Sequence, residues 1–178
     1  KHKVQKRQKF LLTLRSTNNQ KMTEKEIKIS YKEFDSVEEL PADQAELVSA
    51  ARDAMKGSFS PYSGFSVGAA LRLKSGRIVT AANQENAAFP SGLCAERSAM
   101  FYAASNYPED AIVGIAVCGG PEGNMSESPV SPCGACRQVM AQYQRNGGED
   151  MQVILAGTKK IWVFPRVEAL LPFIFDDL

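Results

Sequence analysis

Two cysteine-bearing segments, residues 91–97 (SGLCAER) and residues 131–137 (SPCGACR), decide how this chain is expected to fold. Together they supply three thiols and one carboxylate, those of Cys94, Cys133, Cys136 and Glu96. Thiolates are soft ligands that favour zinc among the common cellular metals, and three protein ligands leave a fourth tetrahedral position open for water. An open position is typical of a catalytic metal site rather than a structural one.

Both segments read as the beginnings of helices. Ser131 is suited to cap one helix, and Pro132 is suited to its first position, where no N–H is required. Cys133 and Cys136 are three residues apart and therefore share a helix face. Cys94 opens an apolar-patterned segment that extends to residue 104. We therefore expect all three sulfurs near helix N-termini, where the positive end of the helix dipole lowers the pKa of a thiol.

The charges around such a site need balancing, because three thiolates around one divalent ion leave a net negative charge. The two helix N-termini and the neighbouring Arg97 and Arg137 are the candidates for this role. Glu96 lies two residues after Cys94 and is not at ligand spacing with the other cysteines. We interpret Glu96 as the proton carrier, a general acid and base beside the metal-bound water.

The two half-motifs, CAE and PCGAC, match the pattern of zinc-dependent nucleobase deaminases: a first ligand, one residue, Glu, and later Pro-Cys-x-x-Cys. The chain resembles cytidine deaminases, specifically the small form with three cysteine ligands. The resemblance runs from about residue 47 to residue 178, through PYSGFSVGAAL, NQENAAFPSGLCAERSA, SPCGACRQVM and LLPFIF. It implies one Zn²⁺ per subunit and hydrolytic deamination of cytidine and 2′-deoxycytidine with release of ammonia, a reaction of pyrimidine salvage.

The same resemblance implies a set of substrate contacts. It assigns Asn83 and Glu85 to the ribose, Phe65 to packing against the base, and the backbone at Ala95 to reading the base edge. The residues by themselves support the first pair only in part. An amide and a carboxylate two residues apart on an extended segment point the same way, yet the stretch also reads as a polar loop in which Asn86 begins a helix.

The C-terminal stretch, residues 170–178, is unusually apolar for an exposed chain end. The resemblance implies a homotetramer in which the aromatic ring of Phe175 reaches the base pocket of the adjacent subunit. Packing of this stretch onto its own domain is the alternative. Phe89 stands where a tyrosine is common in the family.

The hydrophobic pattern predicts an α/β fold, and the resemblance implies a three-layer α/β/α sandwich with a five-stranded mixed sheet. The first helix is expected over residues 41–57, and helices follow Cys94 and Pro132. A weak alternation over residues 24–31 suggests an edge strand. The five main strands are predicted at residues 65–73, 78–83, 111–118, 153–156 and 161–164, with a final helical turn at 167–171.

The chain has 178 residues, enough for one domain with a proper core. Residues 1–21 carry seven Lys or Arg and no acid. Because the formal net charge of the whole chain is +1, residues 22–178 carry a net charge of about −6. We expect residues 1–21 to be an added or misassigned leader, disordered and dispensable, and residues 22–178 to form a single catalytic domain. Four cysteines without a disulfide framework favour a reducing compartment, the cytoplasm.

Four other readings compete with a nucleoside deaminase. A structural zinc site would need a fourth protein ligand, and Cys118 lies in an apolar run where a buried thiol is expected. A nucleic-acid deaminase would need a basic groove with stacking aromatics, whereas the body of this chain is acidic. A deaminase of a cytosine-bearing antibiotic is disfavoured by Asn83-Gln84-Glu85, and a non-enzymatic zinc module stays open. Because the body is acidic, nucleic acid is not an expected partner. Because no stretch reads as a signal peptide, a membrane is not an expected partner either.

Overall fold

The protein is described here by a computed structural model over residues 22–176. Its centre is a six-stranded mixed sheet in the order β1-β6-β5-β4-β2-β3. Strands β4 and β5 run parallel and the other neighbours run antiparallel. The strands are β1 (Lys32–Phe34), β2 (Phe65–Leu73), β3 (Ile78–Ala82), β4 (Ile112–Pro121), β5 (Gln152–Ala156) and β6 (Ile161–Phe164).

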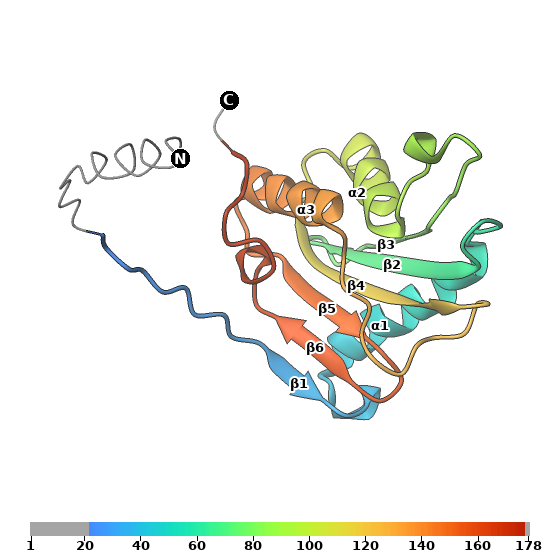
Figure 1. The fold of residues 1–178 in the computed structure, drawn as a ribbon, viewed down its shortest axis with the longest axis horizontal. Helices are drawn as coiled ribbons and strands as arrows, with labels where there is room; N and C mark the ends of the chain where they lie inside the picture. The colour runs from blue at the N-terminus through green and yellow to red at the C-terminus, as the bar shows by residue number, and fades with distance from the viewer. Residues whose placement is uncertain (1–21, 177–178) are drawn as a thin grey trace, which may run out of the picture.

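Helices cover both faces of the sheet (Figure 1). The first, α1 (Ala42–Ala54), packs on one face, and α2 (Ala95–Asn106) and α3 (Gly134–Gly147) pack on the other. Single turns of 3₁₀ helix at Val37–Glu39, Met55–Gly57, Phe89–Ser91 and Val167–Ala169 complete the helical structure of the described residues. This arrangement confirms the expected three-layer α/β/α sandwich.

Strand β4 separates two hydrophobic cores because its apolar residues alternate between the faces. Ile115 and Val117 join the core under α2 and α3, while Ala116 and Cys118 join the core under α1. The continuous apolar run is therefore the mark of a strand that is covered on both sides. Burial raises the pKa of the Cys118 thiol to about 12, so this cysteine is an inert core residue.

The sheet has six strands rather than the expected five, because Lys32–Phe34 adds an edge strand antiparallel to β6. The suggested strand over residues 24–31 is wrong, since that stretch is extended but unpaired and its Ile27 and Ile29 are exposed. What fixes the added edge is side-chain bonding across the pair. The carboxylate of Glu33 accepts hydrogen bonds from Lys160 and from the Trp162 indole, each at 2.8 Å.

The expected leader, residues 1–21, lies outside the described residues. Among residues 22–176, none of the helices has the length and apolar character needed to cross a membrane.

Candidate metal centre and active site

The three cysteines of the two motifs converge at the N-termini of α2 and α3. Cys94 is the N-cap of α2, Cys133 is the N-cap of α3, and Cys136 lies in the first turn of α3. The predicted caps for α3 were wrong by two residues. Cys133 has extended backbone angles (φ −67°, ψ 165°), so the helix begins at Gly134, after Ser131 and Pro132. The expectation that all three sulfurs lie at helix N-termini is confirmed.

The sulfur geometry fits a tetrahedral zinc ion. The Sγ atoms of Cys94 and Cys133 are 4.0 Å apart, those of Cys133 and Cys136 are 3.5 Å apart, and all three lie within 4.8 Å of one another. Zn–S bonds of about 2.3 Å at tetrahedral angles place two sulfurs roughly 3.8 Å apart. Three thiols that cluster at this spacing without forming disulfides could therefore hold one metal ion.

The surroundings favour the thiolate form of Cys94. A hydrogen bond from Cys136 and the guanidinium of Arg97 outweigh partial burial and lower the pKa of the Cys94 thiol to about 5. Nη2 of Arg97 lies 3.8 Å from the Cys94 sulfur. Arg97 thus supplies positive charge at the sulfur, as its place in the sequence suggested.

Glu96 is a buried carboxyl beside the thiol cluster. Only 4% of its surface is exposed, although it belongs to a residue type that is almost never buried without a partner. Burial raises the pKa of Glu96, and the nearby Cys94 adds to this effect. A carboxyl with a raised pKa exchanges protons more readily near neutral pH than an exposed one, which suits a general acid and base.

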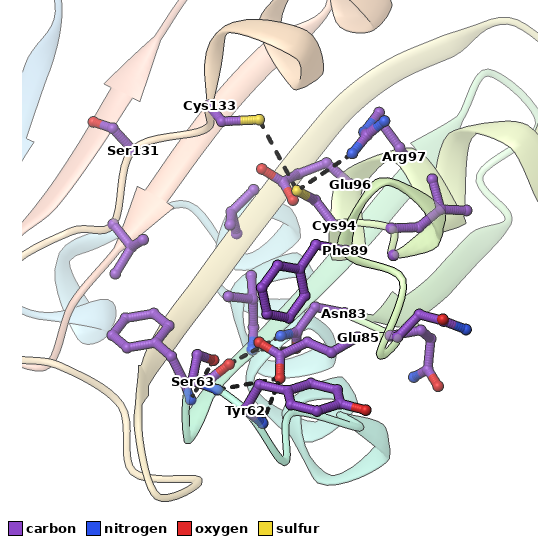
Figure 2. A pocket seen from close by; sticks show the side chains of 18 residues that line it. Tyr62, Ser63, Asn83, Glu85, Phe89, Cys94, Glu96, Arg97, Ser131 and Cys133 are labelled. Carbon is purple, nitrogen blue, oxygen red and sulfur yellow. Dashed lines mark hydrogen bonds between the residues drawn. The ribbon is translucent and has the colours of Figure 1, made fainter.

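A cavity of about 680 Å³ opens from the thiol cluster towards the ends of β2 and β3 (Figure 2). Its lining includes Cys94, Glu96 and Cys133 at one end and Phe65, Asn83 and Glu85 at the other. Val130 and Ser131 contribute a further wall, so the loop before α3 borders the cavity. A cavity of this size accommodates a molecule as large as a nucleoside.

The amide of Asn83 is held in one orientation by the backbone of β2. Its Oδ1 accepts a hydrogen bond from the amide of Val67 at 2.8 Å, and its Nδ2 donates to the carbonyl of Phe65 at 2.9 Å. The hydroxyl of Ser58 donates to the same Oδ1 at 2.6 Å. Because Nδ2 carries two hydrogens, one donor remains for a ligand.

Glu85 is fixed by the turn that precedes β2, as Figure 2 shows. Its Oε2 accepts hydrogen bonds from the amides of Tyr62 and Ser63, at 2.9 and 3.2 Å. The Ser63 hydroxyl and the Tyr62 amide are the main causes that lower the pKa of Glu85. The carboxylate therefore stays ionised at neutral pH and keeps acceptor capacity on Oε1.

The comparisons with known proteins agree with this geometry. The profile of the cytidine and deoxycytidylate deaminase zinc-binding region matches residues 41–147. A cytidine deaminase from Halalkalibacterium halodurans is 46% identical over 56% of this chain and 71% of its own length. One from Sporosarcina psychrophila is 40% identical over 75% of this chain and 92% of its own length.

A solved structure of cytidine deaminase from Burkholderia pseudomallei superposes with a TM-score of 0.62 at 38% identity, covering 73% of this chain and 97% of that one. The chain belongs to the cytidine and deoxycytidylate deaminase family. The expected zinc cofactor is confirmed by the zinc-binding region of that family and by the thiol cluster. The chain is accordingly a zinc-dependent deaminase.

Three residues that the sequence singled out for this deaminase do not line the cavity. Ala95 is completely buried between Cys94 and Glu96. Phe175 has 66% of its surface exposed and is joined to α3 through its main chain. The guanidinium of Arg137 contacts two backbone carbonyls rather than a thiol, those of Pro132 and Leu170.

The sequence reasoning missed the residues that hold the two polar side chains of the deaminase cavity. Ser58, Tyr62 and Ser63 orient Asn83 and Glu85 through hydrogen bonds, yet none of the three was assigned this role from the sequence. No spacing rule could have paired them, since Tyr62 and Glu85 are 23 residues apart.

Proposed function

We propose that this chain converts cytidine and 2′-deoxycytidine to uridine and 2′-deoxyuridine, consuming water and releasing ammonia. The observation that carries the proposal is the buried carboxyl of Glu96 beside three clustered thiols at one end of a nucleoside-sized cavity. Cys94, Cys133 and Cys136 are the proposed zinc ligands. When bound there, zinc supplies Lewis acidity that activates water for attack at C4 of the base.

Glu96 is the proposed proton carrier. It takes one proton from the attacking water and delivers it to N3 of the base. It then takes the second water proton from the new hydroxyl at C4 and delivers it to the departing amine, which leaves as ammonia while C4 becomes a carbonyl. The reaction as a whole needs no net proton at this residue, because each proton that Glu96 accepts is passed on. Burial raises the pKa of Glu96, and a carboxyl with a raised pKa holds a proton more readily than an exposed one, which supports this role.

The polar end of the cavity is proposed to select the sugar. The remaining Nδ2 hydrogen of Asn83 donates to a ribose hydroxyl, and Glu85 accepts the hydrogen of a hydroxyl. Phe65 packs against the base and the backbone at Ala95 reads the base edge. A hydroxyl both donates and accepts, so this pair suits a sugar, whereas the Glu85 carboxylate repels a phosphate.

Several wider features of the family are proposed for this chain as well. We infer a homotetramer in which Phe175 contacts the cavity of an adjacent subunit. The exposed ring of Phe175, with that of Phe173 at 83% exposure, supports such a contact.

Arg97 is the proposed charge-balancing residue. We propose a cytoplasmic location, because free thiols need a reducing compartment. Residues 1–21 as a dispensable leader and 22–178 as a single catalytic domain also stay predictions.

The test follows the ultraviolet absorbance of cytidine, 2′-deoxycytidine, CMP, cytosine and a cytosine-bearing nucleoside antibiotic, with zinc-stripped and zinc-restored protein. We expect zinc-dependent turnover of the two nucleosides only. Glu96→Gln should keep one zinc per subunit and lose activity by about 10²–10⁴-fold, because it removes the general acid and base. Turnover of the antibiotic alone would overturn the substrate assignment, and full activity of Glu96→Gln would overturn the role of Glu96.

A further inference from the structure

We propose that Arg137 is a positioning residue that fixes the sulfur of Cys133 by anchoring the peptide unit in front of it. The inference rests on the proposed function, because it takes Cys133 as a zinc ligand. It goes beyond that function because it assigns Arg137 a mechanical role. The position of Arg137 next to Cys136 in the sequence suggested a different role, the balancing of charge.

Three hydrogen bonds define this role. Nε of Arg137 donates to the carbonyl of Pro132 at 2.9 Å, and Nη1 donates to the carbonyl of Leu170 at 2.9 Å. The backbone amide of Arg137 donates to the carbonyl of Cys133 at 3.0 Å. Arg137 thus binds the carbonyl of Pro132, which precedes Cys133, and the carbonyl of Cys133 itself. Its bond to Leu170 joins both to the C-terminal stretch.

Cys133 needs such an anchor more than the other two cysteines. Cys136 is buried inside α3 and Cys94 is half-buried at the N-cap of α2, whereas Cys133 is exposed at the end of a long loop. Packing contributes little to an exposed side chain, so the position of its sulfur follows from the path of its main chain.

Between residues 126 and 132, hydrogen bonds within the described part of the chain tie that path to the rest of the fold only near its two ends, and Pro132 at the second end is itself buried. At its far end the loop is held by the β5–β6 turn, where Thr158 and Lys159 donate to the carbonyls of Ser126 and Glu127. Within the described part of the chain, residues 128–132 take part in a single hydrogen bond, the one from Arg137 to the carbonyl of Pro132. Without it, the last five residues before Cys133 have no hydrogen bond to the rest of the fold.

The contacts also separate position from charge. Arg97, not Arg137, has its guanidinium at a sulfur atom. The planar guanidinium of Arg137 presents two N–H groups in fixed directions to two carbonyls, which the single ammonium of a lysine does not reproduce. Arg137→Lys therefore keeps the positive charge and loses the two-way anchor.

The experiment measures the rate at which zinc-loaded protein releases metal to a chelating dye, alongside kcat and KM. Residues that support metal ligands contribute about 10–100-fold to metal affinity. We expect Arg137→Ala to release zinc at least about 10-fold faster than the unaltered protein, and Arg137→Lys to release it nearly as fast as Arg137→Ala. Activity should fall in kcat and recover on adding excess zinc. Far-ultraviolet circular dichroism checks folding, and if the alanine variant does not fold, the lysine variant decides.

Two matched controls lie on the same helix. Gln138 bonds the main chain of Phe175 at 2.7 and 3.1 Å, and Arg145 bonds Asp176 at 3.1 Å, so both hold the C-terminal stretch without touching the loop. Gln138→Ala and Arg145→Ala should release zinc within about 2-fold of the unaltered protein, because neither contributes to the anchor that tunes the metal site. Equal acceleration in these controls would overturn the proposal, because it would assign the effect to the C-terminal stretch.

Cys133→Ala separates the inference from the function on which it rests. If this variant binds zinc as tightly as the unaltered protein, the proposed ligand set is wrong. If it loses zinc but both Arg137 variants release zinc at the unaltered rate, the ligand set stands and the positioning role is overturned. If Arg137→Lys alone behaves as the unaltered protein, the charge of Arg137 matters and its geometry does not.

Discussion

At the scale of single residues, the active-site cavity gets its chemistry from side chains whose ordinary behaviour is changed by their surroundings. Burial raises the pKa of Glu96, while the Ser63 hydroxyl and the Tyr62 amide lower that of Glu85. Two glutamates in one cavity are thereby suited to opposite tasks. Glu96 is suited to the proton transfers proposed for it, and Glu85 is suited to accept a hydrogen bond in its ionised form.

The lowered pKa of Glu85 leads to a prediction about stability and pH. A group whose pKa is lower in the folded state stabilises the fold above its unfolded pKa, and this contribution is lost as the pH falls through the folded value. Glu85→Gln should therefore be less stable than the unaltered protein at pH 7. The difference should begin to shrink as the pH falls below the ordinary glutamate pKa of about 4.3, and it should disappear below the lower pKa of the folded state. Urea unfolding of both proteins across this range is the measurement. A difference that grows towards acid pH would contradict the assigned direction.

At the scale of elements, the close packing of α1 on the sheet depends on a glycine in β2. A Cβ atom added at Gly68 in β2 would lie 2.0 Å from the carbonyl oxygen of Ala51 and 2.7 Å from the amide nitrogen of Met55. Both are backbone atoms and cannot rotate away. The glycine therefore allows direct contact between α1 and the strand that carries Phe65 and Val67 to the cavity.

We predict that Gly68→Ala forces α1 away from β2 and costs about 2–3 kcal/mol of unfolding free energy, in the range of overpacked cores. For a chain of this length the melting temperature should fall by roughly 4–12 °C. The matched control is Gly57→Ala, where the added Cβ would lie 3.8 Å from the Ala82 side chain, an ordinary contact. Thermal unfolding followed by circular dichroism gives both values, and equal effects in the two variants would refute the packing argument.

At the scale of the whole molecule, the thiol cluster joins the N-termini of two helices. Cys94 belongs to α2, and Cys133 and Cys136 belong to α3. The two helices lie on the same face of the sheet (Figure 1). A metal ion held by these sulfurs would therefore stabilise the folded arrangement of that entire layer.

Removal of zinc should lower the melting temperature of the whole domain. A ligand present at 1,000 times its dissociation constant stabilises the folded state by about 4 kcal/mol, which corresponds to roughly 8–16 °C for a chain of this size. Differential scanning calorimetry before and after chelation measures the shift, and adding zinc back should reverse it. An unchanged melting temperature in a protein that demonstrably lost its zinc would mean that the metal does not join the two helices.

The sequence by itself determined the α/β fold, the two metal helices and the zinc cofactor, because these depend on local periodicity and on rare residues at short spacings. The three-layer sandwich was implied by the family resemblance that the same motifs carry. The run of residues 111–118 is apolar throughout, and CAE and PCGAC keep their ligand groups within three residues. Such signals survive in the sequence since the elements that carry them are local.

Only the tertiary structure decided which residues hold these groups in place. Glu33 made a sixth strand through contacts with Lys160 and Trp162, more than 120 residues away, and Tyr62 oriented Glu85 across 23 residues. Arg137 was placed near the metal by the sequence, but its two carbonyl partners followed from the packing of a loop and the C-terminal stretch on α3. Contacts between distant segments depend on where the folded backbone brings them, and no pattern along the chain encodes that meeting directly.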